Sequence, residues 1–497
     1  MKNFLYILLI ITSVSLSAQS SKKVEILNAD YTFADINKHP EYWRLIGNVS
    51  FKHNNTIMHC DSAYHFTNKN KIKAFGKIKI VKDKNLILTG KKLTYNSEIS
   101  QAKIQGNVKL VDQYMTLTTE KLLFNSNTNI ASYPSYGTII EYEKTINSKK
   151  GEYHSNIHKF IFKDSVQVST KDYNINTDNM HYHTNSETAY FFGPSYIISK
   201  NKKIYCENGW YNTKKNISQF KKNAAIFSEK YILKGDSMYY NKNLGYGKAI
   251  KNVTLIDTLE KTIVHGGLAE YFEKTKSIEI TNKPWLETLF ETDTLFMYAN
   301  KFISTKVAEK KVLLAYNKVK FFTKKIQGKS DSLCYNFSDS SIQIFNKPIL
   351  WSDNFQITAD SIDLFTNQKK INYMILKPNP MIIAREDSLD YNQIKGKEMI
   401  IYFKDNNINI IDIKGNGQSI FIVKDEEENK KIGLNYTECT DLKLYFQNNK
   451  LEAVNYETQP KSTTKPYAKI NEKDRYLKGF HWREKEQPKN KQDIFIE

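Results

Sequence analysis

One short pattern recurs along the chain at nearly constant intervals, and this repeat limits the possible folds more than any other feature. The pattern is a small residue, two polar residues, an apolar residue, any residue, and then Tyr or another large apolar residue. It is clear in Gly90-Lys-Lys-Leu93-Thr-Tyr95 and in Thr177-Asp-Asn-Met180-His-Tyr182. The first seven small residues stand at positions 60, 90, 119, 148, 177, 206 and 235, so each step is 29 or 30 residues. A period of this length predicts stacked supersecondary units.

A second half-unit, about eleven residues upstream of the first, alternates apolar and polar residues, as in Gly106-Asn-Val108-Lys-Leu110. Alternation with period two is typical of a strand with one buried face. The last position of this half-unit forms an apolar column: Phe51, Ile80, Leu110, Ile139, Val168, Ile197, Ile226, Leu255, Phe321 and Leu350. The first half-unit adds Leu93, Tyr95, Leu122, Phe124, Met180, Tyr182, Met238 and Tyr240. We predict that both sets share one inner face.

Two strands in each of about thirteen units predict an all-β fold with some 25 strands. One unit cannot bury its apolar face alone, so neighbouring units must stack into an elongated, repetitive solenoid. The aromatic content of 13% agrees with β-structure. Residues 268–276 could form a short helix, but Tyr271 belongs to the repeat, so we predict a strand there.

The first eighteen residues read as a signal peptide. Lys2 precedes an apolar run from Phe4 to Leu16, and Ser17-Ala18 supplies small residues for cleavage before Gln19. The alternative of an uncleaved anchor is less favoured, because the apolar run is shorter than the ~20 residues that span a bilayer. The sequence therefore predicts an exported chain, either soluble or peripherally attached to a membrane.

Motifs for catalysis or metal binding are weak. His154, His158, His181 and His183 could gather around a metal, but half-exposed strand positions explain them equally well. An Asp follows the small residue in many repeats (Asp61, Asp178, Asp236, Asp331 and Asp360), and paired carboxylates can hydrolyse glycosides. A residue that recurs in every unit is better explained as a corner residue. We therefore predict no enzyme activity, no catalytic residue, no metal site and no cofactor.

The four cysteines and the charge fit an exported repeat protein. Cys60, Cys206 and Cys439 occupy the small-residue column, which predicts small buried residues rather than disulfides, and Cys334 lies on a strand beside that column. The chain has 73 Lys and Arg against 53 Asp and Glu, a net charge of +20. This excess indicates solvated strand faces or an anionic partner. Export disfavours nucleic acid as that partner and favours an anionic lipid surface.

The paired strands Ala102-Lys-Ile-Gln-Gly-Asn-Val-Lys-Leu110 and Leu117-Thr-Thr-Glu-Lys-Leu-Leu-Phe124 resemble the OstA/LptA-like family of lipopolysaccharide-transport proteins. The resemblance implies a β-jelly-roll folded like a V and open along one edge. It implies an apolar interior that carries lipid A acyl chains across the periplasm, edge-to-edge contacts with other jelly-roll proteins of lipopolysaccharide transport, and an outer-membrane translocon as a partner. The likeness is strong in residues 19–260 and continues with insertions through 261–450, and residues 451–497 form a basic tail or cap.

On this resemblance the two apolar sets become lipid-binding residues of a periplasmic bridge or scaffold, which could associate with the outer membrane. The alternative for the same residues is an ordinary closed solenoid core. At the level of function, the alternative is a structural surface β-solenoid or adhesin without a lipid groove. A carbohydrate-active solenoid enzyme ranks third, since the sequence offers no singular acid/base pair.

Overall fold

The computed structural model describes residues 23–83, 85–113, 115–290, 293–367, 370–404, 407–425, 427–428, 430–447 and 450–496. The predicted signal peptide, residues 1–18, lies outside these ranges. The described residues form the strands β1 to β40 and six short 3-10 turns, so the predicted all-β class is confirmed. The chain divides into two compact units, Met1–Ser195 (unit 1) and Tyr196–Glu497 (unit 2).

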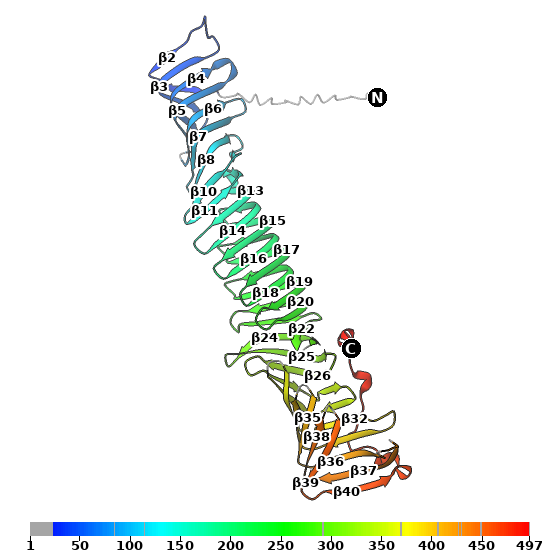
Figure 1. The fold of residues 1–497 in the computed structure, drawn as a ribbon. Coiled ribbons are helices and arrows are strands. Elements are labelled where there is room, and N and C mark those ends of the chain that lie inside the picture. The colour runs from blue at the N-terminus through cyan, green and yellow to red at the C-terminus, as the bar shows by residue number, and fades with distance from the viewer. Residues whose placement is uncertain are drawn as a thin grey trace, which may run out of the picture. The chain divides into compact units, whose positions relative to one another are not determined.

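Unit 1 is a ladder of antiparallel strands (Figure 1), and half of them are eleven or twelve residues long. Its strands are β1 (Glu25–Asn28), β2 (Tyr31–Phe33), β3 (Trp43–His53), β4 (Thr56–Phe66), β5 (Lys71–Lys82), β6 (Leu86–Asn96), β7 (Gln101–Val111), β8 (Thr116–Asn125), β9 (Ile130–Tyr133), β10 (Gly137–Glu141), β11 (Lys144–Ser148), β12 (Lys150–His154), β13 (Lys159–Ser169) and β14 (Tyr173–His183). The 3-10 turns η1 (Thr67–Lys69) and η2 (Ser155–Ile157) join strands, and β15 (Thr188–Ser199) leads into unit 2.

Each long strand bends at its middle, where the register shifts by a bulge. In β5 the shift falls between Phe75 and Ile78, and Gly76 and Lys77 there have φ of +73° and +36°. A β-bulge bends its strand and increases the local twist. The row of bulges therefore forms a corner that divides the long strands into two halves, while β9 to β12 each lie on one side of it.

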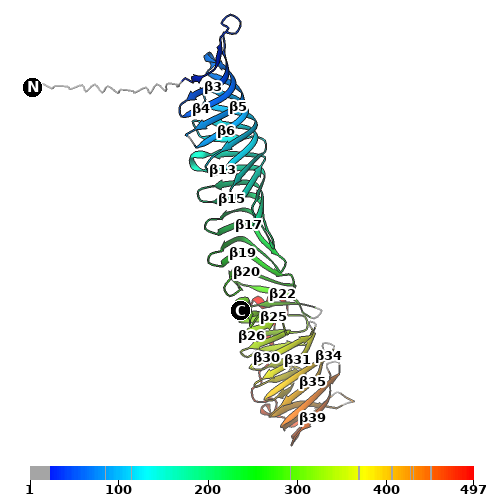
Figure 2. The same cartoon turned by 90° about the vertical axis from the view of Figure 1, so that its left-hand side faces the viewer.

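The two halves make two arms that meet at the corner. Arm A carries the Phe51 column and ends in the turns that follow β3, β5, β7 and β10, which we call lip A. Arm B carries Tyr95 and ends in the turns that follow β4, β6, β8, β12 and β14, which we call lip B. The space between the arms is the trough, and the gap between the lips is its mouth. Figure 2 shows the ladder of unit 1 from a second side.

Unit 2 repeats the two-armed ladder, and Figure 2 shows β17, β19, β20, β22, β25 and β26 following one another along it. Its strands are β16 (Lys202–Asn212), β17 (Ile217–Ser228), β18 (Tyr231–Asn241), β19 (Tyr246–Asp257), β20 (Thr262–Phe272), β21 (Ser277–Thr281), β22 (Trp285–Phe290), β23 (Asp293–Tyr298), β24 (Lys301–Val307), β25 (Lys310–Phe322), β26 (Gln327–Asn336), β27 (Ser341–Phe345), β28 (Ile349–Ser352), β29 (Phe355–Thr358), β30 (Ser361–Asn367), β31 (Lys370–Lys377), β32 (Met381–Arg385), β33 (Tyr391–Lys395), β34 (Glu398–Lys404), β35 (Asn407–Lys414), β36 (Gly417–Lys424), β37 (Lys431–Cys439), β38 (Asp441–Gln447), β39 (Lys450–Glu457) and β40 (Lys461–Pro466). Of the segment 268–276, residues 268–272 lie in β20, which confirms the predicted strand there, and residues 273–276 form the turn that follows it.

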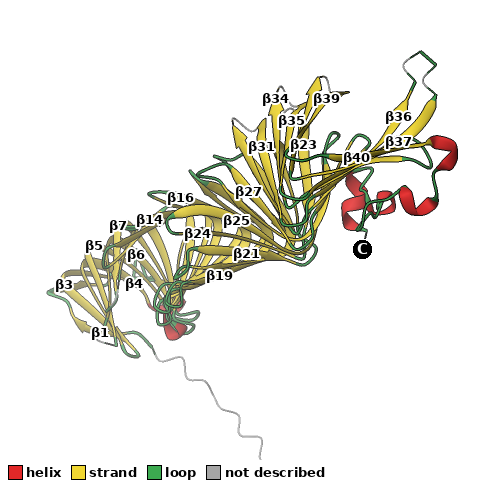
Figure 3. Cartoon of the chain, turned by 90° about the horizontal axis from the view of Figure 1, so that it is seen from below, coloured by secondary structure: helices red, strands yellow, loops and turns green. Residues whose placement is uncertain are grey.

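The strand count exceeds the expected 25 because many repeats break at the corner into two shorter strands. Prolines stand at four of these breaks, at positions 134, 284, 348 and 378. Proline has no N–H to donate to the ladder, so it ends a strand. Beyond β30 the halves belong to separate strands, and Figure 3 shows β34, β35 and β39 diverging from β36, β37 and β40.

The sequence predicts a tail over residues 451–497, but β39 and β40 pair with β38 and β37 as part of the ladder. The tail begins after Pro466 and lies on the outer face of arm A in unit 2. It includes the 3-10 turns η3 (Tyr467–Lys469), η4 (Glu472–Asp474), η5 (Glu484–Glu486) and η6 (Lys491–Phe495). Three buried glutamines of arm A hold it. Gln393 donates to the Arg475 carbonyl at 2.6 Å, Gln356 donates to the His481 carbonyl at 2.7 Å, and Gln487 of the tail donates to Gln327 at 2.9 Å.

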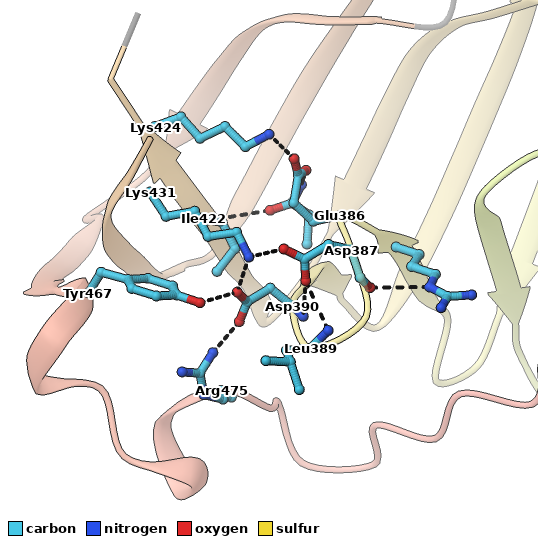
Figure 4. A network of polar contacts seen from close by, with 11 residues as sticks. Glu386, Asp387, Leu389, Asp390, Ile422, Lys424, Lys431, Tyr467 and Arg475 are labelled. Carbon is cyan, nitrogen blue, oxygen red and sulfur yellow. Dashed lines mark hydrogen bonds and ion pairs between the residues drawn. The ribbon is translucent and has the colours of Figure 1, made fainter. Parts of the chain in front are cut away.

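A polar network fixes the start of this tail (Figure 4). The carboxylate of Asp390, only 1% exposed, accepts hydrogen bonds from Lys431 at 2.5 Å and from Tyr467 at 2.5 Å, and it is paired with Arg475. Lys431 also binds Asp387, which lies beside it. The network joins the turn before β33 to β37 and to the first residues of the tail.

Candidate functional site: an apolar trough between two arms

The inner face of arm A in unit 1 is an unbroken ladder of opposed apolar residues. Strand pairing sets each member directly opposite the next across neighbouring strands. The ladder runs Phe51, Met58, Ile80, Leu88, Leu110, Leu117, Ile139, Ile146, Val168 and Ile175. All ten side chains are at most 3% exposed. The 29-residue step therefore places the same face of every strand in the trough.

Arm B of unit 1 contributes a second ladder, whose residues lie near lip B in each repeat. It runs Tyr95, Ala102, Phe124, Ala131, Tyr153, Phe160 and Tyr182. Tyr153 and Phe160 stack with ring centroids 4.3 Å apart. The alanines of this ladder did not stand out in the sequence, since small residues alone do not mark a buried face.

Unit 2 also has an apolar ladder on each arm, and its arm B ladder includes Met238, two residues before the Tyr240 position that corresponds to Tyr95. Arm A runs Ile226, Leu233, Leu255, Val264, Leu286, Met297, Phe321, Gly328, Leu350, Ile357, Ile382 and Ile394. Arm B runs Phe220, Met238, Ala249, Ala269, Ile280, Phe302, Ala315, Leu333, Ile344, Ile362, Leu376, Met399, Ile413 and Leu442. Sequence reasoning missed most of these, although they alternate with polar neighbours as the predicted columns do.

Sixteen of the eighteen predicted lipid-binding residues are buried, and Ile226 and Tyr240 are half-buried. Tyr240 donates a hydrogen bond to Glu273 at 3.3 Å, and burial together with that carboxylate raises the pKa of Tyr240 to about 12. Burial places these side chains inside the fold. Their role toward a lipid stays a prediction.

The two inner faces of unit 1 touch each other. The rings of Phe51 on arm A and His65 on arm B lie 6.0 Å apart, edge to face. Burial lowers the pKa of His65, so the neutral ring is favoured inside the trough. The trough in this state is filled by its own side chains rather than standing open.

Polar side chains bridge the mouth of unit 1 at four successive repeats, and we call each bridge a clasp. In the first clasp His53 of lip A and Tyr95 of lip B share a 2.5 Å hydrogen bond. In the second, Lys82 donates to the Ser126 carbonyl at 2.8 Å and lies 5.6 Å from the centre of the Phe124 ring. The resemblance implied an open edge, but here that edge is bridged.

The third and fourth clasps use buried tyrosines. Tyr153 donates to Asp112 at 2.6 Å. Tyr182 accepts from Lys144 at 2.5 Å and donates to Glu141 at 3.4 Å, while Lys144 and Glu141 form an ion pair at 2.7 Å. Burial, with the neighbouring carboxylate, raises the pKa of both tyrosines, so each hydroxyl keeps its proton and can donate.

Unit 2 has a fifth clasp and three connected cavities. Lys311 pairs with Asp257 and lies 4.8 Å from the centre of the Phe337 ring. Two cavities of about 40 Å³ each share lining residues Leu295, Met297, Leu333 and Ile342. A third, of about 110 Å³, shares Ile326, Leu350 and Ile371 with one of them.

The largest of these three cavities opens at the lips of unit 2. Lys325 and Asp353 line it from lip A, and Phe403 and Asn407 line it from the turn between β34 and β35 on the other arm. Leu350, a predicted lipid-binding residue, lines its inner wall. The cavities therefore lie between the arms, where an apolar guest would lie.

The repeated acidic residues serve the corner, as predicted. Asn252 donates to Asp236 at 3.0 Å, Asn346 donates to Asp331 at 3.2 Å, and Asn379 donates to Asp360 at 2.9 Å. All three asparagines have positive φ: Asn252 lies at a bulge of β19, and Asn346 and Asn379 lie where a repeat breaks into two strands, so each carboxylate binds the corner of the next repeat. These contacts give the acid a structural role at the corner in three of the repeats that carry it.

The histidine and cysteine candidates are distributed through the fold. His181 and His183 lie on the same strand face, beside Phe192 and Tyr190. Among the described residues no group of three or more His, Cys, Asp and Glu could hold a metal ion. The four cysteines are free thiols, with Cys60 and Cys206 buried as the repeat predicted. Burial raises the pKa of both thiols to about 12, which keeps them unreactive.

The protein is an all-β repeat protein, in which a repeated β-ladder is bent into two arms with an apolar inner face. The sequence profile of the OstA-like protein family matches residues 21–178 and 175–236. Residues 21–236 of the chain are therefore similar to OstA-like proteins, and the predicted resemblance is confirmed in this region.

One similar solved structure is that of LptH from Pseudomonas aeruginosa, the LptA-homologous periplasmic component of the lipopolysaccharide transport device. The match has 9% identity and a TM-score of 0.21, and it covers 22% of this chain and 81% of that chain. No curated protein matches the chain. Within the described ranges, no helix is both long enough and apolar enough to cross a bilayer.

Proposed function

We propose that this protein is a periplasmic bridge or scaffold that carries lipopolysaccharide toward the outer membrane with the acyl chains in the trough. The observation that carries the proposal is the pair of continuous apolar ladders that face each other along the arms. The OstA-like match in residues 21–236 supports the same function. No catalytic step is part of it.

The ladders suit a moving guest better than a fixed one. Every repeat offers a similar apolar surface, so an acyl chain gains about 25 cal/mol per Å² of buried surface at each position. Equivalent positions in series differ little in free energy, which favours sliding. The cavities of unit 2, at about 110 and 40 Å³, show where the inner packing is looser.

The partners follow from the same proposal. Lipopolysaccharide is the cargo, other jelly-roll proteins of its transport would pair with the edge strands, and an outer-membrane translocon would receive it. At one end of the fold, β39 and β40 are the last strands of the two arms, pairing with β38 and β37. An unpaired strand edge is a template for another strand.

Depletion of the protein in the cell that makes it tests this function. We expect newly made lipopolysaccharide to accumulate at the inner membrane, measured by membrane fractionation after pulse labelling. A plasmid copy of the full chain should restore delivery. Normal arrival at the outer membrane after depletion would overturn the proposal.

The bridged mouth of unit 1 favours a second candidate, a structural surface solenoid without a lipid groove. Its interior would then be an ordinary core, and the clasps would only stabilise it. Such a protein should bind no lipopolysaccharide when purified, and its loss should leave lipopolysaccharide delivery unchanged. Both measurements therefore separate the two candidates.

A further inference from the structure

The clasps of unit 1 follow the repeat, because they recur at equivalent positions in four successive units. On lip A the bridging residues stand at 53, 82, 112 and 141, and on lip B the aromatic residues stand at 95, 124, 153 and 182. Each clasp links a repeat to the next one through residues 41 to 44 apart, counting the Ser126 carbonyl for Lys82. In the second clasp Phe124 stands where the other clasps have tyrosine, and Lys82 donates to the Ser126 carbonyl in the adjacent turn.

The interior behind the clasps has no room for a polar head. Leu110 and Leu117 behind the third clasp are at most 1% exposed, and the cavities between the arms of unit 2 are about 110 and 40 Å³. Burying hydroxyls or charges of a sugar head without partners is also costly. An amphiphile in the trough must therefore keep its head outside and only its acyl chains inside.

This geometry has a consequence for movement along the trough. A guest with its head outside and its acyl chains inside crosses the plane of the mouth at every position it occupies. A closed clasp lies across that plane, so such a guest cannot pass it. Opening is feasible, because each clasp consists of only one to three hydrogen bonds or ion pairs.

We infer that the clasps are a row of gates that an amphiphile opens in turn as it moves along unit 1. The inference rests on the proposed function, because it assumes a guest of this kind. Opening of the first, third and fourth clasps frees a tyrosine hydroxyl, and opening of any of the four frees a charged or imidazole group at the lip. Those groups can bind the hydroxyl or phosphate oxygens of the polar head, which remains outside.

The first test weakens the clasps. The full mature chain with Tyr95→Phe, Tyr153→Phe and Tyr182→Phe loses three hydroxyls and keeps the rings. We expect fluorescein-labelled lipopolysaccharide to associate about fivefold faster, in stopped-flow polarisation, since one hydrogen bond no longer opposes each opening. The matched control is Tyr31→Phe, Tyr136→Phe and Tyr142→Phe, at three exposed tyrosines, which should leave the rate unchanged.

The second test locks one clasp and remains informative where the triple variant folds poorly. Asp112→Cys and Tyr153→Cys, in a chain whose four own cysteines are replaced by serine, are joined by a reducible bis-methanethiosulfonate linker. Leu117 is replaced by a photo-reactive benzoylphenylalanine. Labelling of this position by lipopolysaccharide should fall at least several-fold when the linker is in place and recover on reduction. The same cysteines capped with a monofunctional reagent serve as the control.

The outcomes separate the two proposals. No binding or labelling by any form of the protein would overturn the proposed function itself. Binding by the unmodified chain, with equal rates in the tyrosine variants and equal labelling with and without the linker, would overturn the gates and leave the proposed function standing. Faster association in the first test or blocked labelling in the second supports the gates.

Discussion

At the scale of single residues, the fold depends on side chains that recur once per repeat and that have one structural role each. The apolar column fills the trough, and the corner acids bind the bulge asparagines. Gly76 illustrates how strict a position can be. Its φ is +73°, and a Cβ there would lie 2.3 Å from Asp61 Oδ2. Glycine avoids both the strain of this positive φ and the clash with Asp61, because it has no Cβ.

The sequence predicted the residues whose pattern is local. Leu110 and Val168 alternate with polar neighbours, so their burial follows from period two alone. The clasps could not be predicted in this way, because His53 and Tyr95 meet only after two strands bend at a corner whose geometry the pattern does not specify. The clasp residues of both lips do recur with a step of about 29 residues, which was visible in the sequence. That step does not show which polar residue of one lip bonds which aromatic residue of the other.

Leu110→Ala tests the inner ladder at this scale. The side chain is fully buried, so its truncation leaves a cavity, and we expect a loss of about 2–5 kcal/mol in the free energy of unfolding. Urea denaturation followed by circular dichroism measures it. Lys109→Ala, on the outward face of the same strand, is the matched control and should change the midpoint little. Equal effects would show that Leu110 does not face a packed interior.

At the scale of elements, unit 2 differs from unit 1 in its broken strands and in the tail that covers arm A. The prolines at positions 134, 284, 348 and 378 stand where strands end, because proline has no N–H for the ladder. The position of the tail could not be predicted from the sequence, because its anchors Gln327, Gln356 and Gln393 are polar residues that look solvent-exposed in a strand pattern. Their burial makes sense only with the tail in place, since each amide needs a partner.

Asp390→Ala should release the start of the tail. It removes a buried carboxylate that binds Lys431, Tyr467 and Arg475, and loss of the buried member of an ion-pair network is destabilising. Limited proteolysis should then cleave the tail at least several-fold faster. Asp387→Ala, whose side chain is 43% exposed, is the control and should have a much smaller effect. Unchanged proteolysis in the Asp390 variant would show that the network does not hold the tail.

Acid should weaken the same network through Asp387. The hydrogen bond from Lys431 lowers the pKa of Asp387 from 3.8 to about 2, with further help from the amides of Leu389 and Asp390. The folded pKa is depressed, so this contribution to stability is complete above pH 3.8 and is lost as pH falls toward 2. The loss is small because the side chain is partly exposed.

Urea midpoints between pH 5 and pH 2 measure this effect. The difference in midpoint between the wild-type chain and Asp387→Asn should shrink across that window. A difference that stays constant with pH would contradict the assigned cause.

At the scale of the whole molecule, the chain solves a problem that every repeat protein shares, which is to cover apolar faces that stacking alone leaves exposed. Most faces are covered by the opposite arm. The outer face of arm A in unit 2 is covered by the tail, where Leu477 packs with Met381, Ile383, Ile420 and Leu434. The all-β class and the repeat followed from the sequence, whereas this covering segment has no repeat and could not be placed.

Removal of residues 467–497 should therefore expose an apolar patch. We expect the truncated chain to bind more of the dye ANS and to self-associate, measured by fluorescence and by size-exclusion chromatography with light scattering. Lys485→Ala with Lys489→Ala lowers the charge of the tail without removing its apolar contacts, and it should behave like the wild-type chain. A truncated chain that stays monomeric without added dye binding would show that the tail covers nothing apolar.

The central claim is that acyl chains lie between the two arms, and site-specific photo-crosslinking in living cells tests it most directly. A photo-reactive residue is placed in turn at Leu350, which lines the 110 Å³ cavity, and at the outward-facing Lys79 and Lys109. The account predicts lipopolysaccharide adducts from Leu350 and few from the two lysine positions. Adducts from the lysine positions alone would contradict it.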